Sequence, residues 1–494
     1  MESIFYFVKY FLTFFYVISF LFLCVFGLHR YYLVLLYKKL KSKKTTPKTF
    51  FIQLPKVTVQ LPIYNEMYVV ERLIKSVCEI DYPKNLLEIQ VLDDSTDKTS
   101  EITCSYVERY KKLGFDIRYV HRKNRLGFKA GALNHGLKLS SGEFLAIFDA
   151  DFIPPKDFLK RTIHYFSDPS IGVVQTRWGH VNQNYSLLTK AQSILLDGHF
   201  IIEQTTRYLK GLFFNFNGTA GIIRKDCIKS SGGWQHDTLT EDLDLSYRAQ
   251  VNGWRLVYLK DLISNAELPV DMNAFKSQQF RWAKGGTQTA KKLLWTIFSN
   301  KKIPLRTKLE SAFHLLGNFS YLFLLILIIL MVPMGMFWSS LGWKYLLLIS
   351  VFAISAGTFS IVRFYILAIS EAHKENAYKF YKFIPLAIGL GTGIAVNNSK
   401  AVLEAMYGKI TEFKRTPKYA VVDHKDNWKT MSYVASKEIT TIIEFCLGIV
   451  FTVLTALSIY KGYISWIPFL LLIQFGFIYT SFLSIYHSSR KHDI

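Results

Sequence analysis

The chain has 494 residues, half of them hydrophobic, and a formal charge of +23. In a soluble protein this charge would suggest nucleic acid, but much of it lies beside apolar runs, where anionic lipid headgroups explain it. The five cysteines form no C-x-x-C pair and the histidines have no metal-ligand spacing, which argues against a zinc site or a disulfide framework. The composition predicts a protein of the lipid bilayer with no nucleic-acid partner.

The first apolar run, residues 11–28, reaches the ~20 residues of a membrane span when 31–37 is included. Basic residues follow it in place of a small-residue cleavage site, so we expect an anchor and not a cleaved signal peptide. These residues are His29, Arg30, Lys38, Lys39, Lys41, Lys43 and Lys44. They place the end of the anchor in the cytoplasm, which predicts an outside N-terminus, an anchor segment 1–46 and a cytosolic domain 47–309.

Short β-branched runs alternate with helical patterns in the cytosolic domain. The predicted strands are 57–61, 88–92, 117–121 and 144–148, and the predicted helices are 69–78, 99–112, 131–138 and 156–166. Strict alternation of this kind predicts right-handed crossovers and an α/β fold with a mostly parallel sheet. In such sheets, ligands bind at the carboxyl ends of the strands.

Polar residues follow three of the predicted strands at this edge. They are Tyr64 and Glu66 in "LPIYNE", Asp93 and Asp94 in "VLDDSTD", and Asp149 and Asp151 in "FDADF". Each pair has a simpler explanation, because Asp and Asn are common turn formers. Several carboxylates at one edge would repel one another unless a cation compensates, and a divalent metal holding a diphosphate would do so.

A phosphate contact is suggested by "RLGFKAGALNHGL", residues 125–137, where a helix begins. We expect Lys129 and the backbone near Gly131 to face phosphate oxygens. The alternative is an ordinary glycine-containing loop before a helix.

A second carboxylate pair opens an amphipathic helix in "TLTEDLDLSYRAQ", residues 238–250. Thr238 and Glu241 fit a capping box, which would be a purely structural role. That explanation leaves Asp242 without a function. A carboxylate near the sheet edge could act as a general base toward an attacking hydroxyl.

Farther on, "SQQFRWAKGG" places Gln278, Arg281 and Trp282 at positions i, i+3 and i+4, on one helical face. Arg and Trp near a membrane are often only interfacial anchors. This motif is therefore explained either as such an anchor or as part of a functional site.

Four more apolar runs of span length follow, at 319–338, 345–369, 439–460 and 464–486. The shorter run 383–396 contains Pro385 and three glycines, so we expect it to lie at the interface. This predicts about five spans, a hairpin 310–370, a basic cytosolic segment 371–437 and a C-terminal hairpin 438–494.

Taken in order, these motifs resemble the inverting family-2 glycosyltransferases of the cellulose synthase superfamily. The likeness is closest to the cellulose-synthase-like mannan and glucan synthases, of the glucomannan 4-beta-mannosyltransferase type, and to their bacterial relatives. It also includes "FNGTAG" at residues 216–221 and "EFKRTPKY" at 412–419, and it covers nearly the whole chain. The resemblance implies a GT-A type domain joined to transmembrane helices.

The resemblance implies a role for each matching residue. Asp149 and Asp151 would bind Mn²⁺ or Mg²⁺, Tyr64 with Asp93 or Asp94 would hold the base, and Glu66 and Lys129 would complete the nucleotide-sugar site. Asp242 would be the catalytic base. The acceptor site would comprise Gly218, Thr219, Glu241, Gln278, Arg281 and Trp282. Phe413, Thr416 and Lys418 are similar to a gating loop, although Arg415 stands where that loop has valine; a plain basic loop is the alternative.

The implied function is transfer of glucose or mannose, from UDP-glucose or GDP-mannose, to a growing β-linked polysaccharide by a processive enzyme. One alternative is transfer to a lipid acceptor, and another is a non-catalytic nucleotide-sugar-binding transporter or scaffold. No cyclic-dinucleotide-binding domain is expected after Tyr486, and the few spans suggest that an accessory subunit or an oligomer completes an export path. A bacterial plasma membrane and a plant Golgi membrane both fit.

Overall fold

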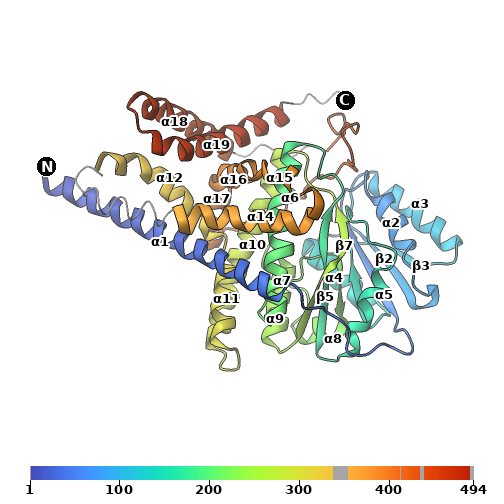
Figure 1. Cartoon of the computed structure of the whole chain (residues 1–494). Helices are drawn as coiled ribbons and strands as arrows, with labels where there is room; N and C mark the ends of the chain where they lie inside the picture. The colour runs from blue at the N-terminus through green and yellow to red at the C-terminus, as the bar shows by residue number, and fades with distance from the viewer. Residues whose placement is uncertain (1, 338–353, 412, 434–438, 490–494) are drawn as a thin grey trace.

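The computed structural model describes residues 2–337, 354–411, 413–433 and 439–489. Figure 1 shows a sheet domain beside a group of long helices, with the N-terminus at the far end of helix α1 (Glu2–Leu40).

The described residues form a seven-stranded sheet in the order β3-β2-β1-β4-β6-β5-β7. The strands are β1 (Val57–Ile63), β2 (Leu87–Asp93), β3 (Asp116–His121), β4 (Phe144–Ile147), β5 (Ile171–His180), β6 (Gly221–Arg224) and β7 (Arg255–Ala266). Among these strands only β6 runs antiparallel to its neighbours, β4 and β5. The predicted α/β fold with a mostly parallel sheet is confirmed.

The helices that follow each of the first four strands also lie where the periodicity predicts them. They are α2 (Val70–Cys78), α3 (Thr99–Lys112), α4 (Phe128–Leu139) and α5 (Phe158–Thr162), the last continuing as a 3-10 helix, Ile163–Ser167. Strands β1, β2 and β4 are almost wholly buried, as expected for parallel strands covered on both faces. The register pairs Ile63 with Asp93, and Asp93 with His121, so the carboxyl ends of β1, β2 and β3 are level.

Two further helices hold the site against the sheet. Helix α9 (Glu241–Val251) packs against the long helix α10 (Met272–Ser299), which in turn contacts α17 (Ala395–Met406) and α19 (Ile467–Ser488). Lys276 of α10 forms a buried ion pair with Glu444 of α18 (Thr440–Tyr460), with 2.8 Å between Nζ and Oε2. This contact fixes α10 relative to the apolar helices.

Three described helical stretches are long and apolar enough to cross a membrane: Ile4–Leu40, Thr440–Tyr460 and Ile464–Ser488. Two bent pairs, Leu305–Leu315 with Phe319–Met334 and Tyr378–Gly393 with Ala395–Met406, raise the number to as many as five if each pair is counted as one span. On α1, the apolar side chains of Ile4 and Phe7 are each 70% exposed, as expected for a surface that faces lipid.

These helices coincide with four of the predicted spans. The exception is the predicted span 345–369: residues 345–353, like residue 338 of the preceding span, lie outside the described residues. Its remainder is helical and ends in α14 (Ser360–His373). The predicted interfacial segment 383–396 corresponds to α16 (Ile384–Gly393) and belongs to a bent pair, so its interfacial position stays a prediction.

Candidate functional site

A cleft of about 220 Å³ opens at the carboxyl ends of the parallel strands. Residues at or after the ends of β1, β2 and β4 line it: Tyr64, Glu66, Asp94, Asp149 and Asp151. Helices α4, α9 and α10 add Lys129, Glu241, Asp242, Gln278, Arg281 and Trp282, and the later segment adds Phe413, Thr416 and Lys418. The structure therefore brings most of the singled-out residues into one cleft.

Each aspartate of "FDADF" has a lysine partner. The Lys129 ammonium lies 2.5 Å from Asp149 Oδ1 and 3.1 Å from the Gly218 carbonyl oxygen. Lys418 donates to Asp151 Oδ2 at 2.6 Å and also to the carbonyl of Glu267. Burial raises the pKa of the Asp149 carboxyl more than the Lys129 charge lowers it. Each of the two carboxylates is thus paired with its own cation from another part of the chain.

The structure separates the two aspartates of "VLDDSTD". Asp93 is fully buried and accepts hydrogen bonds from the Ser95 backbone N–H, the Ser100 hydroxyl and the Tyr119 hydroxyl. It does not line the cleft, whereas Asp94 does. Asp93 therefore shapes the loop, and Asp94 is the one that a nucleotide base could reach.

Arginines that sequence patterns did not identify lie beside Asp94 and Tyr64. Arg122 donates to Asp94 through Nε at 2.7 Å and through Nη2. The Arg125 guanidinium lies 3.3 Å from the centroid of the Tyr64 ring, in a stacked arrangement. Arg122 directly follows β3, so the strand-end argument that identified Asp94 could also have found it.

Asp242 lies in the first turn of α9 and faces the cleft. Its Oδ1 accepts a hydrogen bond of 2.8 Å from the Leu243 backbone N–H. Burial, followed by the neighbouring Glu241 charge, raises the pKa of Asp242 to about 7, although Lys129 acts in the opposite direction. Asp242 can therefore exchange a proton near neutral pH.

The capping-box explanation of Thr238 and Glu241 is wrong. Helix α9 begins at Glu241, and its N-cap is Thr240, whose side chain forms no capping hydrogen bond. A capping box needs the acidic residue in the third helical position, and here Glu241 occupies the first. Glu241 instead lines the cleft beside Asp242, and burial raises its pKa.

The "FNGTAG" loop, residues 216–221, contacts both Asp149 and Asp242. Thr219 accepts a 2.9 Å hydrogen bond at Oγ1 from the Asp149 backbone N–H. Gly218 has φ +80°, and a Cβ built on it would lie 2.9 Å from Asp242 Oδ2. Both the conformation and the contact require glycine at this position. Gly218 and Thr219 therefore position Asp242 and Asp149 without being among the cleft-lining side chains.

We expect Gly218→Ala to lower turnover by about 10- to 100-fold if Asp242 is the general base, because the new methyl group would displace the Asp242 carboxylate from its place in the cleft. Steady-state kinetics with a nucleotide-sugar donor measure this effect. Gly211→Ala is the matched control, because Gly211 also has positive φ (+70°) but no atom within 4 Å of the added Cβ. If both variants lost turnover equally, backbone strain and not displacement of Asp242 would be the cause.

Residues 413–418 close the cleft from one side. Arg281 of α10 donates to the Thr416 hydroxyl at 2.7 Å and to the Lys414 carbonyl at 2.5 Å. Its guanidinium lies 5.0 Å from the Phe413 ring centroid, and burial lowers the pKa of Arg281 to about 10. Gln278 and Trp282 of the same helix line the cleft as well.

Arg415, which replaces the valine of the similar loop, pairs with Glu66 at 3.0 Å. It also lies 3.9 Å from the centroid of the Tyr433 ring, and the Tyr433 hydroxyl donates to Asp97 Oδ2 at 2.5 Å. Burial raises the pKa of Glu66 to about 8 despite the nearby Arg415 charge. Sequence reasoning did not identify this pairing, because no local pattern joins positions 66 and 415.

Asp149 and Asp151 could hold a metal ion only if a bound ligand supplied further donor atoms. The described part of the chain contains no group of three or more His, Cys, Asp or Glu side chains that could hold a metal ion. Asp149 and Asp151 supply hard oxygen donors, and Mg²⁺-like ions are commonly held by one or two carboxylates plus substrate phosphates and water. The ammonium groups beside both aspartates show that this position favours cations. The donor set therefore fits a divalent ion shared with a diphosphate.

Comparisons with known proteins show what this chain is similar to. Residues 55–285 match the family described as Glycosyltransferase like family 2. Probable glucomannan 4-beta-mannosyltransferase 7 of Oryza sativa subsp. japonica is 42% identical over 273 residues, which are 54% of this chain and 46% of the relative. Glucomannan 4-beta-mannosyltransferase 2 of Arabidopsis thaliana is 45% identical over 257 residues, 50% of this chain and 48% of the relative. The chain spans about half the length of the curated relatives it matches.

A solved structure shares the fold. The mannosyltransferase PcManGT from Pyrobaculum calidifontis, in complex with GDP-Man and Mn²⁺, has a TM-score of 0.54 and 19% sequence identity, with 78% of this chain and 100% of that chain covered.

Proposed function

We propose that the protein is a membrane-bound inverting hexosyltransferase, because residues 55–285 match the glycosyltransferase family 2 model and contain a mostly parallel sheet. The donor would be GDP-mannose and the acceptor a growing β-linked polysaccharide. The choice of mannose rests on the names of the relatives at 42% and 45% identity. The observation that carries the proposal is the cleft itself, which holds Asp149 and Asp151 together with Asp242 and Trp282.

The donor half of the cleft would bind the nucleotide sugar. Asp94 and Tyr64 would face the base, and Lys129 would approach the diphosphate. Asp149 and Asp151 would hold Mn²⁺ or Mg²⁺, which neutralises charge on the departing diphosphate when bound. The lysines that follow α1 support a cytosolic position for this half, where nucleotide sugars are available.

The acceptor half would carry out the proton transfer. Asp242 accepts the proton of the acceptor hydroxyl, and the hydroxyl oxygen forms a bond to the anomeric carbon. The bond from that carbon to the diphosphate oxygen breaks at the same time, and its electron pair leaves with the nucleoside diphosphate. Attack from the opposite face inverts the configuration. Trp282 would support the terminal acceptor sugar, because an indole face suits the apolar face of a sugar ring.

The pKa of Asp242, raised to about 7, predicts a pH-dependent rate. A general base acts only when deprotonated, so kcat/KM should rise as pH increases through 7 and level off above it. Below pH 7 the rate should fall about tenfold per pH unit. Initial rates between pH 5.5 and 8.5, at saturating metal, measure the profile. A rate that is flat across this range would contradict the role of Asp242 as the base.

A donor panel tests the function as a whole. Purified protein in lipid nanodiscs is incubated with Mn²⁺, an oligosaccharide primer and GDP-mannose, UDP-glucose or UDP-N-acetylglucosamine. We expect nucleotide release from GDP-mannose alone, with a long product that β-1,4-mannanase digests. Nucleotide release from UDP-glucose would contradict GDP-mannose as the donor but retain the enzyme class. A short lipid-linked product would favour a lipid acceptor. No release from any primed donor would contradict the proposal.

A further inference from the structure

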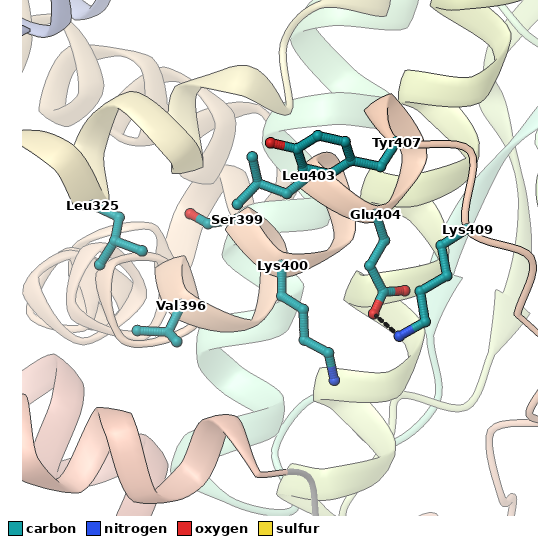
Figure 2. A pocket seen from close by; sticks show the side chains of 8 residues that line it. All are labelled: Leu325, Val396, Ser399, Lys400, Leu403, Glu404, Tyr407 and Lys409. Atoms are coloured by element: carbon teal, nitrogen blue, oxygen red, sulfur yellow. Dashed lines mark hydrogen bonds and ion pairs between the residues drawn. The ribbon is translucent and has the colours of Figure 1, made fainter.

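A second hollow lies away from the cleft, between α12 (Phe319–Phe337) and α17 (Figure 2). Its volume is about 340 Å³, and none of the described residues that line it also lines the cleft. Leu325 comes from α12, while Val396, Ser399, Leu403 and Tyr407 follow one another along α17. Steps of three and four residues place these α17 side chains on one face of the helix, so the hollow is a groove along that face.

The two ends of the groove differ in character. Leu325 and Val396 pack with the apolar cluster around Ile328 and Phe451, inside the candidate membrane helices. At the other end the Tyr407 side chain is 86% exposed. Figure 2 shows Leu325 and Val396 on one side, the Glu404–Lys409 pair on the other, and Lys400 between them. The groove therefore runs from an apolar interior toward a charged surface.

Among the described residues, three ammonium groups lie near one carboxylate at the charged end. Glu404 pairs with Lys284 at 2.9 Å and with Lys409 at 3.1 Å, so two ammonium groups share one carboxylate. Lys400 adds a third ammonium group, 5.6 Å from the centroid of the Phe280 ring. Such an excess at the boundary of the hydrocarbon attracts anionic headgroups.

We propose that this groove binds an anionic phospholipid. One acyl chain lies along Leu325, Val396 and Leu403, and the phosphate contacts Lys400 and Lys409. The volume suits part of a lipid, because ligand pockets are commonly about 300 to 1,000 Å³. The apolar-to-cationic order along the groove is the order of chain and headgroup in a phospholipid. The proposal goes beyond the glycosyltransferase function and does not depend on it.

Native mass spectrometry of the purified full chain tests the proposal. Delipidated protein is titrated with phosphatidylglycerol or phosphatidylcholine, and the bound copies are counted. We expect a preference for phosphatidylglycerol, reduced about fivefold by Lys400→Gln and by Lys409→Gln, because a lysine near a membrane surface contributes roughly that factor. Lys461→Gln is the matched control, since Lys461 is exposed and lies between α18 and α19, outside the groove.

Three results would overturn the proposal. Equal retention of the two lipids would remove the role of the lysines, and an equal loss in Lys461→Gln would show a general charge effect. Displacement of the lipid by soluble β-linked mannohexaose would assign the groove to the glycan. Gel filtration of every variant verifies that the chain remains folded, so that a loss of lipid is assigned to the groove.

Discussion

Replacing Asp242 with Asn should lower kcat by roughly 10³- to 10⁴-fold, because the amide cannot take the acceptor proton. The substitution is nearly isosteric, and the Leu243 N–H can still donate to the side-chain oxygen. Donor binding should therefore remain, and single-turnover kinetics together with GDP binding by calorimetry would separate the two effects. The site geometry supports this prediction, because Asp242 is half-buried and faces the cleft at the start of α9.

Asp237→Asn is the control for this variant. Asp237 is five residues earlier, its side chain is 57% exposed, and it pairs with Lys292 outside the cleft. It should retain normal turnover. Full activity in Asp242→Asn, or an equal loss in both variants, would remove Asp242 from the proton transfer.

Replacing Asp151 with Asn should lower turnover by about 10²- to 10³-fold and raise the Mn²⁺ concentration needed for half-maximal rate. The side chain would lose its charge where a metal and a diphosphate are expected to meet, and Lys418 would lose the ion pair that it forms with Asp151 at 2.6 Å. Mn²⁺ binding in the presence of GDP, followed by electron paramagnetic resonance, gives a readout that does not depend on turnover.

The neighbouring exposed Asp157 offers a matched control. Its side chain is 51% exposed and forms an ion pair with Arg161 at 3.3 Å, so Asp157→Asn should leave Mn²⁺ binding unchanged. An unchanged Mn²⁺ affinity in Asp151→Asn would show that the metal, if it is used, is held elsewhere.

Local pattern determined the first part of the sheet domain, β1 to β4 with α2 to α5, but it did not predict β5, β6 or β7. Apolar, β-branched runs located β1 to β4, and the 3.6-residue hydrophobic period located α2 to α5, within four residues at each boundary, because burial imposes such patterns on the chain. The strand-end rule then brought Tyr64, Asp94 and the Asp149–Asp151 pair to one edge, since parallel strands share a direction. The apolar helices could also be predicted from the sequence, because the length of a membrane span follows from the thickness of the bilayer.

The order of motifs supplied what periodicity could not. A structural explanation is plausible for Asp242 alone, and also for the set of Gln278, Arg281 and Trp282. Only the order of all the motifs along the chain indicated a glycosyltransferase. The comparison with family 2 over residues 55–285 bears out that identification.

What the sequence by itself determined was therefore the first four strands with their helices and the apolar helices, and it also indicated the class of chemistry that we propose. Tertiary structure alone decided that Asp94, not Asp93, faces the cleft, and that Glu241 does not cap its helix. It also brought Lys418 to Asp151, although 267 positions separate them in the chain. Burial of one face repeats every few residues and therefore leaves a local pattern in the sequence. A contact such as that of Lys418 with Asp151 depends instead on the fold of the whole chain, which no local pattern encodes.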